Sequence, residues 1–231
     1  MFILTNLKDI TILAPTQFDK DFNEAIKEYI NQKYANKVIL KLGLAISLWD
    51  IQKFEHSYIL QNDSNAYTRV FFRYVIFSPF IDEIIIGKIK SSTQDGIHIT
   101  IGFFDDIIVP SHLFQEKSLF DEKEQTWYWE YQTIVDEQDI QEIRQEMSPK
   151  SHKLFMDVGE EIRFRIIDKI YIDNNLTNMV KDSDQPSSFT NLSNKNINEN
   201  NLPNYLGNNP APMTLIGSIA EPGLGLLTWW T

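Results

Sequence analysis

The stretch IIIGKIKSSTQDGIHITIGFFDDIIVP, Ile84 to Pro110, constrains the fold of this chain more than any other segment. Apolar residues alternate with Lys88 and Lys90 as far as a turn that contains glycine. A second alternating run then leads to a pair of phenylalanines, Phe103 and Phe104. Such runs, bounded by turn residues, are typical of strands with one buried face. We therefore expect consecutive strands with exposed lysines, which is what a small barrel offers to single-stranded nucleic acid.

The charge of the chain is unevenly distributed, and this decides whether a polyanion could bind. The formal net charge is -11. Residues 1–79 contain 9 Lys/Arg and 8 Asp/Glu, whereas residues 80–231 contain 12 Lys/Arg and 24 Asp/Glu. Residues 120–147 alone hold 9 acids and 2 bases, while Ile84–Phe104 holds two lysines and one aspartate. Because the acidic residues are concentrated in one segment, the net charge does not exclude contact with nucleic acid.

Residue types that are missing exclude several classes of protein. The chain has 0 cysteines, so disulfides, thiolate metal sites and cysteine nucleophiles are excluded. Its histidines, His56, His98, His112 and His152, show no spacing typical of a metal site. No apolar run approaches the roughly 20 residues of a membrane span, and the alternating start does not resemble a signal peptide. We expect a soluble intracellular protein without metal, cofactor or membrane contact.

The first third of the chain predicts an α+β domain. Residues 1–13 alternate as a strand does, and Pro15-Thr16 predicts a helix that begins with Thr16 as its N-cap and continues to about Tyr34. Its apolar stripe consists of Phe18, Phe22, Ile26 and Ile30. Further strands are expected at residues 38–41, 44–50, 57–60 and 68–77. This order predicts one helix packed on an antiparallel sheet, in a domain that spans residues 1–79.

Residues 80–231 predict an all-β domain. Strands are expected at residues 83–90, 97–103, 107–109, 161–172 and 213–219. Five short strands separated by turn residues fit an OB-type barrel. Two inserts interrupt it: an acidic one at about 120–152, with a helical turn expected over 139–147, and one at about 173–210. The second contains 12 Asn within residues 173–209, so we expect it to be disordered.

The sequence shows no active-site motif. It has neither a GxSxG elbow nor a GxxxxGK phosphate loop. Asp105 and Asp106 are adjacent carboxylates, and neighbouring residues in a strand point to opposite faces, so such pairs seldom share a metal. A nuclease with these two aspartates as metal ligands is the best enzymatic alternative that the residues offer.

The predicted barrel offers cations and rings for a nucleic-acid groove. The candidate residues are Lys88, Lys90, His98, Phe103, Phe104, Arg163 and Arg165. Stacking of a base on an aromatic ring is worth about 1–3 kcal/mol, and phosphate contacts add a salt-dependent contribution. The alternative interpretation is that one phenylalanine belongs to the core and that the lysines are ordinary strand charges.

The end of the chain, IGSIAEPGLGLLTWWT, carries a second aromatic group. Pro222, Leu224, Trp229 and Trp230 are candidate residues for contact with a partner. Two exposed tryptophans would form a costly apolar patch. They are expected to pack either on the chain's own surface or on another protein, since aromatic anchors are enriched at interfaces.

Several segments together resemble one family. MFILTNLKDITI, VIFSPFIDEIIIGKIK, GIHITIGFFDDIIVP, GEEIRFRIID and IGSIAEPGLGLLTWW are similar to the larger stalk subunit of multisubunit RNA polymerases. This family includes the larger stalk protein of the archaeal RNA polymerase and the seventh subunit of RNA polymerase II. FFDDI and EPGLGLLTWW look most like its RNA polymerase III member.

The resemblance implies an N-terminal tip domain followed by an S1-type OB-fold, and a role in the nucleus. The implied partners are a smaller helical stalk subunit, the polymerase III core, initiation factors and, weakly, nascent single-stranded RNA. The implied subunit is non-catalytic and assists initiation at genes for small RNAs such as tRNA and 5S rRNA.

Two residues depart from the pattern of strong RNA binders in S1 barrels. His98 stands where many of them carry Phe, and Pro110 stands where His is common. RNA affinity is therefore expected to be modest and independent of sequence. A stand-alone S1-type RNA-binding accessory protein is the main alternative function.

Overall fold

The computed structural model describes residues 1–132, 151–172 and 211–230, which fall into two compact units, Met1–Phe80 and Ile81–Thr231. The expected helical turn over 139–147 and the expected disorder over 173–210 lie outside the described residues. Among the described helices, none has the length and apolar character needed to cross a membrane.

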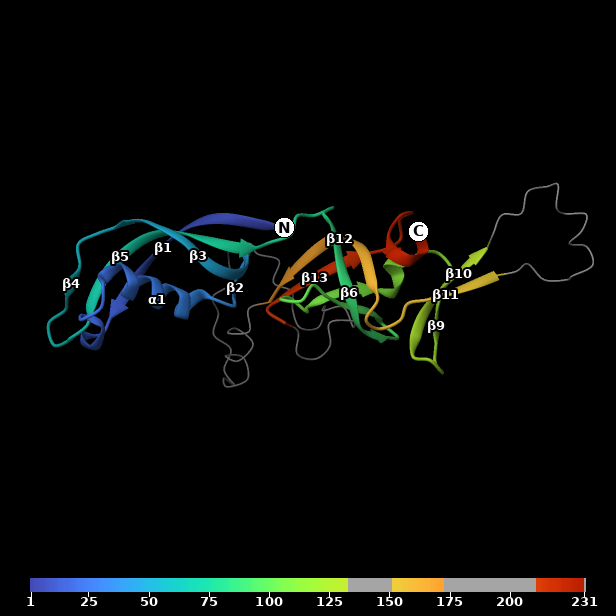
Figure 1. Cartoon of the computed structure of the whole chain (residues 1–231), viewed down its shortest axis with the longest axis horizontal. Helices are drawn as coiled ribbons and strands as arrows, with labels where there is room; N and C mark the ends of the chain where they lie inside the picture. The colour runs from blue at the N-terminus through green and yellow to red at the C-terminus, as the bar shows by residue number, and fades with distance from the viewer. Residues whose placement is uncertain (133–150, 173–210, 231) are drawn as a thin grey trace, which may run out of the picture. The chain divides into compact units, whose positions relative to one another are not determined.

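The first unit is an antiparallel sheet with one helix against it. Its elements are β1 (Phe2–Leu13), η1 (Pro15–Gln17), α1 (Phe22–Tyr34), β2 (Lys37–Ile39), β3 (Gly43–Phe54), β4 (Tyr58–Ile59) and β5 (Ala66–Phe77). The strands lie in the order β1-β5-β3-β2, and β4 pairs with β5. α1 covers one face of this sheet (Figure 1). The predicted helix on an antiparallel sheet is confirmed.

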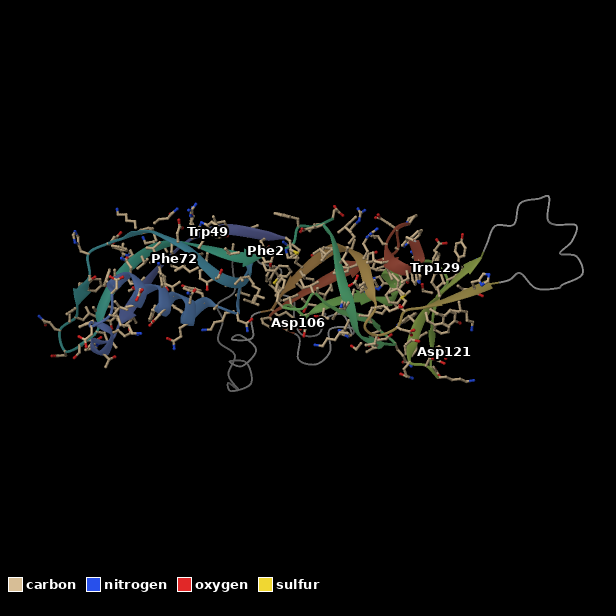
Figure 2. The ribbon with its side chains drawn as sticks, viewed as in Figure 1. Phe2, Trp49, Phe72, Asp106, Asp121 and Trp129 are labelled. Atoms are coloured by element: carbon tan, nitrogen blue, oxygen red, sulfur yellow. The ribbon has the colours of Figure 1, made fainter. Side chains whose placement is uncertain are left out.

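Alternation along the strands builds the core of this unit. Phe72, Tyr74 and Ile76 of β5 are fully buried and alternate with partly exposed residues. Ile26 and Ile30 of α1 are equally buried and belong to the same cluster. Phe72 is labelled in Figure 2. Each such side chain stabilises the fold by roughly 1.5–3 kcal/mol.

The helix begins later than the sequence predicts. Residues 15–17 form only a 3-10 turn, and α1 starts at Phe22. Its N-cap is Asp21, whose Oδ2 accepts hydrogen bonds from the backbone N–H groups of Asn23 (3.1 Å) and Glu24 (3.3 Å). Thr16 is therefore not the cap. The predicted apolar stripe is only half buried: Phe18 precedes the helix and is 49% exposed, and Phe22 at the helix start is 38% exposed.

The second unit is built on a closed barrel. Its strands are β6 (Ile84–Thr93), β7 (Gly96–Thr100), β8 (Ile107–Pro110), β12 (Glu161–Tyr171) and β13 (Met213–Ser218). They pair in the order β13-β8-β7-β6-β12, and pairing of β12 with β13 closes the ring. β8 and β13 run parallel, and the other barrel pairs are antiparallel. This five-strand connectivity is that of an OB-fold, as predicted.

A three-stranded sheet that the sequence analysis missed accompanies the barrel. It consists of β9 (Ser118–Asp121), β10 (Thr126–Gln132) and β11 (Ser151–Phe155), in the order β11-β10-β9. These strands occupy both ends of the region assigned as an acidic insert. Trp127 anchors the sheet, because it is 8% exposed and its Nε1 donates a hydrogen bond to the Thr93 carbonyl at 2.7 Å.

Each of the two internal segments outside the described residues is flanked by residues that pair with each other in neighbouring strands. Tyr171 of β12 lies opposite Met213 of β13. Gln132 of β10 likewise lies opposite Ser151 of β11. The strand pairs on either side of each segment are therefore in register at the points where the segment begins and ends.

One partly buried carboxylate ties the helix of the first unit to its sheet. Asp9 of β1 accepts hydrogen bonds from Lys33 Nζ at 2.5 Å and from Tyr34 OH at 2.8 Å. Burial pushes the pKa of Asp9 up, but the hydrogen bonds from these two residues outweigh burial and hold the pKa below its ordinary value.

This arrangement predicts a pH-dependent loss of stability. A carboxylate with a lowered pKa stabilises the fold above its unfolded pKa of about 3.9, and that contribution is lost as the pH falls through the folded pKa. Asp9→Asn should lower the free energy of unfolding by about 1–2 kcal/mol at neutral pH. Urea unfolding between pH 7 and pH 3 should show that the difference in free energy of unfolding between wild type and variant becomes smaller as the pH falls. A difference that stays constant would contradict the prediction.

Candidate nucleic-acid interface

The two lysines of β6 lie on the open face of the barrel. Lys88 and Lys90 alternate with the buried residues Gly87 and Ile89. Their side chains are 62% and 53% exposed. The described chain therefore does not cover this side of β6, and both ammonium groups can reach solvent.

Each lysine has a nearby carboxylate within the barrel. Lys88 Nζ lies 3.9 Å from Glu161 Oε1, and Lys90 Nζ lies 2.8 Å from Asp105 Oδ2. Hydrogen bonds from Lys90 and from the Thr100 hydroxyl lower the pKa of Asp105. Exposed ion pairs of this kind contribute only about 0–1 kcal/mol. A phosphate group can therefore compete for either lysine.

His98 of β7 lies beside Lys90 but adds no positive charge at neutral pH. Burial and the charge of Lys90 lower the pKa of His98, and Asp106 offsets this only in part. Burial and the neighbouring Asp105 raise the pKa of Asp106. The imidazole is therefore available for hydrogen bonding or stacking rather than for neutralising a phosphate.

The two phenylalanines have different environments. Phe103 is 46% exposed, whereas Phe104 is 5% exposed and belongs to the core of the barrel. The Ile101 N–H donates to the Phe104 carbonyl at 3.1 Å, which closes a tight turn around Gly102. Phe104 is therefore wrong as a candidate for base stacking, because a buried ring offers no face to a base.

The two arginines bind the C-terminal segment of the chain. Arg163 Nη1 donates to the Gly223 carbonyl at 3.3 Å. Arg165 Nη2 lies 2.7 Å from Glu221 Oε2, and its Nη1 lies 3.8 Å from Asp82 Oδ1. Both share the outer face of β12, as their alternation predicts. They serve internal contacts, however, so of the four candidate cations it is the two lysines that stay exposed.

Asp105 and Asp106 gather no further metal-ligating side chains from the part of the chain that the structure describes. Asp105 is bound by Lys90 and Thr100. Among the residues that the structure describes, no group of three or more His, Asp or Glu side chains is suited to hold a metal ion. The nuclease alternative therefore has no assembled ligand set in this region.

The C-terminal tryptophans pack on the chain itself. They belong to η5 (Leu227–Trp230), which follows β14 (Gly225–Leu226), a short strand paired with β12. The ring centroid of Trp129 in β10 lies 5.2 Å from that of Trp229 and 6.4 Å from that of Trp230. Trp230 is nevertheless 44% exposed. Sequence reasoning missed Trp129, although the alternating run TWYWEY gave a signal for a strand.

The other two candidates for partner contact have opposite environments. Leu224 is 3% exposed, and its carbonyl accepts hydrogen bonds from Gln115 Nε2 at 3.1 Å and Trp230 Nε1 at 3.0 Å. Pro222 is exposed. The Leu224 side chain is therefore wrong as a direct partner contact, because it lies inside the second unit.

The chain combines a helix-backed sheet with an OB barrel that carries exposed lysines. Comparison with known families agrees with both parts. Residues 8–64 match the family described as "SHS2 domain found in N terminus of Rpb7p/Rpc25p/MJ0397". Residues 83–230 match the family described as "RNA polymerase III subunit Rpc25". The chain belongs to the Rpc25 family of RNA polymerase III subunits.

Similar proteins span the full length of the chain. The RNA polymerase III subunit RPC8 of Bos taurus is 43% identical over 231 residues, which cover 100% of this chain and 99% of that protein. The rpc8 subunit of Schizosaccharomyces pombe is 35% identical over 230 residues, with 100% of both chains covered. A more distant relative, Rpo7 of Sulfolobus acidocaldarius, is 25% identical over 121 residues, covering 52% of this chain and 66% of that one.

The packing of the two tryptophans predicts unequal effects of their removal. Trp229 lies against Gly225, where an added Cβ would come within 2.5 Å of the indole ring, and it also contacts Trp129. Trp229→Ala should destabilise the second unit by about 2 kcal/mol, below the roughly 3–5 kcal/mol of a fully buried tryptophan. Trp230→Ala should cost less than about half as much, because its ring is more exposed. Urea unfolding followed by near-UV circular dichroism measures the loss of stability in both variants. Equal destabilisation by the two substitutions would contradict this packing.

Proposed function

We propose that the chain is a non-catalytic stalk subunit of RNA polymerase III. In this proposal the domain of residues 1–79 docks on the polymerase core, and the chain forms a heterodimer with a smaller helical subunit. It assists initiation, together with initiation factors, at genes for small RNAs such as tRNA and 5S rRNA in the nucleus. The full-length similarity to polymerase III subunits is the observation that carries the proposal.

An exposed apolar surface on the first unit supports docking. Phe18, Phe22 and Ile59, which are 49%, 38% and 63% exposed, line an open hollow. Tyr58 and Leu60, on either side of Ile59, are 46% and 50% exposed. Apolar patches on soluble proteins commonly mark interaction sites. We assign this hollow to contact with the polymerase core.

Contact with nascent RNA is proposed for the lysine-bearing face of the barrel. Lys88 and Lys90 supply charge, and Phe103 supplies an exposed ring. Neighbouring carboxylates compete for both lysines, which favours weak contact without sequence preference. The names of the full-length relatives count against the alternative of a stand-alone RNA-binding accessory protein.

Purification under native conditions tests the assembly. The tagged chain should be recovered with a small helical partner and with the large catalytic subunits of RNA polymerase III. Recovery as a lone monomer, with no polymerase subunit attached, would contradict the proposed function.

Replacing both lysines tests the RNA contact. Lys88→Ala combined with Lys90→Ala should weaken binding of single-stranded RNA by the purified heterodimer, because two phosphate contacts are lost. The slope of log K against log salt should become less steep by about 1.4, at about 0.7 for each phosphate. Fluorescence anisotropy at several salt concentrations measures this slope.

A matched variant separates a local contact from a general loss of charge. Lys27→Ala combined with Lys37→Ala removes two exposed lysines from the first unit that do not line the apolar hollow, and should leave the slope unchanged. Recovery with polymerase should be normal for both double variants. If the variant with both Lys88→Ala and Lys90→Ala were no longer recovered with the polymerase but kept its RNA affinity, this face would be assigned to polymerase contact instead of RNA contact.

A further inference from the structure

The first strand of the chain forms a long sheet edge. Within the described residues, β1 pairs with β5 alone. The pairing runs from Phe2 opposite Phe77 to Leu13 opposite Ala66 without a register shift. Among the described residues, β1 therefore has one side paired with β5 and one side with no strand beside it from Leu4 to Leu13.

The hydrogen-bond pattern shows which backbone groups face the open side. The Ser78 N–H donates to the Met1 carbonyl at 3.0 Å, across the same antiparallel register. In an antiparallel pair, hydrogen-bonded and non-hydrogen-bonded positions alternate. Odd-numbered residues of β1 therefore bond to β5, and even-numbered residues direct N–H and C=O outward. The outward residues from position 4 onward are Leu4, Asn6, Lys8, Ile10 and Ile12.

This edge lacks most of the features that protect natural sheet edges. Such edges are usually short, bulged, charged or interrupted by proline. β2, at the other edge of the sheet, has only 3 residues, and β3 next to it has register shifts at three points. β1 has 12 residues, no proline and no bulge. Lys8 is the single charged residue among its outward positions.

The side chains at the same positions are apolar and exposed. Leu4 is 47% exposed, Ile10 is 37% exposed and Ile12 is 38% exposed. Their backbone groups point away from β5 while their side chains lie on the face of the sheet not covered by α1. An added strand would use both, since main-chain hydrogen bonds supply affinity and alternate side chains supply specificity.

We infer that β1 binds an extended segment of a different polypeptide, which joins the sheet as an additional strand. The inference rests on the proposed function only in taking the assembled polymerase as its setting. Residues 4–12 offer about 30 Å of edge at roughly 3.3 Å per residue. The segment should carry alternating apolar residues and an acidic residue opposite Lys8.

A second copy of this chain is a poor occupant. An antiparallel self-pairing that uses residues 4–12 of both copies places Leu4 opposite Ile12 and Lys8 opposite Lys8. Like charges directly opposite one another are destabilising in a sheet. The charge pattern therefore favours a heterologous strand with complementary charge.

Hydrogen exchange tests strand addition directly. Amides of Thr5 and Leu7 bond to β5 and should be protected in the isolated chain. Amides of Leu4, Asn6 and Lys8 should exchange quickly in the isolated chain, and at least about tenfold more slowly within the purified polymerase. Residue-resolved exchange by fragmentation mass spectrometry measures this alternation. Equal, fast exchange of the even-numbered amides in the complex would overturn the inference.

Charge reversal tests the occupant. Lys8→Glu should weaken recovery with the polymerase by at least about tenfold, whereas Lys8→Arg should retain it. Lys27→Glu is the matched control, because it makes the same charge change at an exposed position of α1 and should have no effect. A thermal melt of each isolated variant checks folding, since Lys8 Nζ also lies 5.1 Å from the centre of the Phe71 ring.

The outcomes separate this inference from the proposed function. If the wild-type chain brings down the polymerase but Lys8→Glu does so equally well, the edge inference fails and the function stands. If the wild-type chain brings down no polymerase, the proposed function fails. A dimer of the isolated wild-type chain in which the amides of Leu4, Asn6 and Lys8 exchange slowly would show self-pairing and overturn the choice of occupant.

Discussion

The pairing of β12 on both of its sides is the constraint on which the second unit depends. β12 bonds to β6 on one side and to β13 on the other, so it converts an open sheet into a closed barrel. Its inward residues Ile162, Phe164 and Ile166 are fully buried, while its outward arginines hold the C-terminal segment. One strand therefore closes the core and fixes the end of the chain.

Sequence patterns were sufficient for the architecture because alternation and turn residues are local signals. They predicted the helix on a sheet, the five barrel strands and the shared face of Lys88 and Lys90. They failed at the helix start, where Asp21 rather than Thr16 caps α1. They also failed for β9, β10 and β11, because the acidic composition of that region obscured the alternation of Trp127 and Trp129.

The site was harder to predict, since side-chain partners depend on tertiary contacts. Nothing local to the FF pair distinguishes the exposed Phe103 from the buried Phe104. The capture of Arg165 by Glu221 joins residues far apart in the chain. Alternation could place the arginines on a face, but it could not show that this face is occupied by the chain's own C-terminal segment.

The paired strand ends at Tyr171 and Met213, and at Gln132 and Ser151, have a consequence for sequence divergence. Each connection starts and finishes at neighbouring points, so its length does not alter the geometry of the strands it joins. In general, doubling the length of a loop between two fixed ends costs only about 0.6 kcal/mol of closure entropy. Natural variants of this protein can therefore gain or lose residues at these two junctions with little thermodynamic penalty.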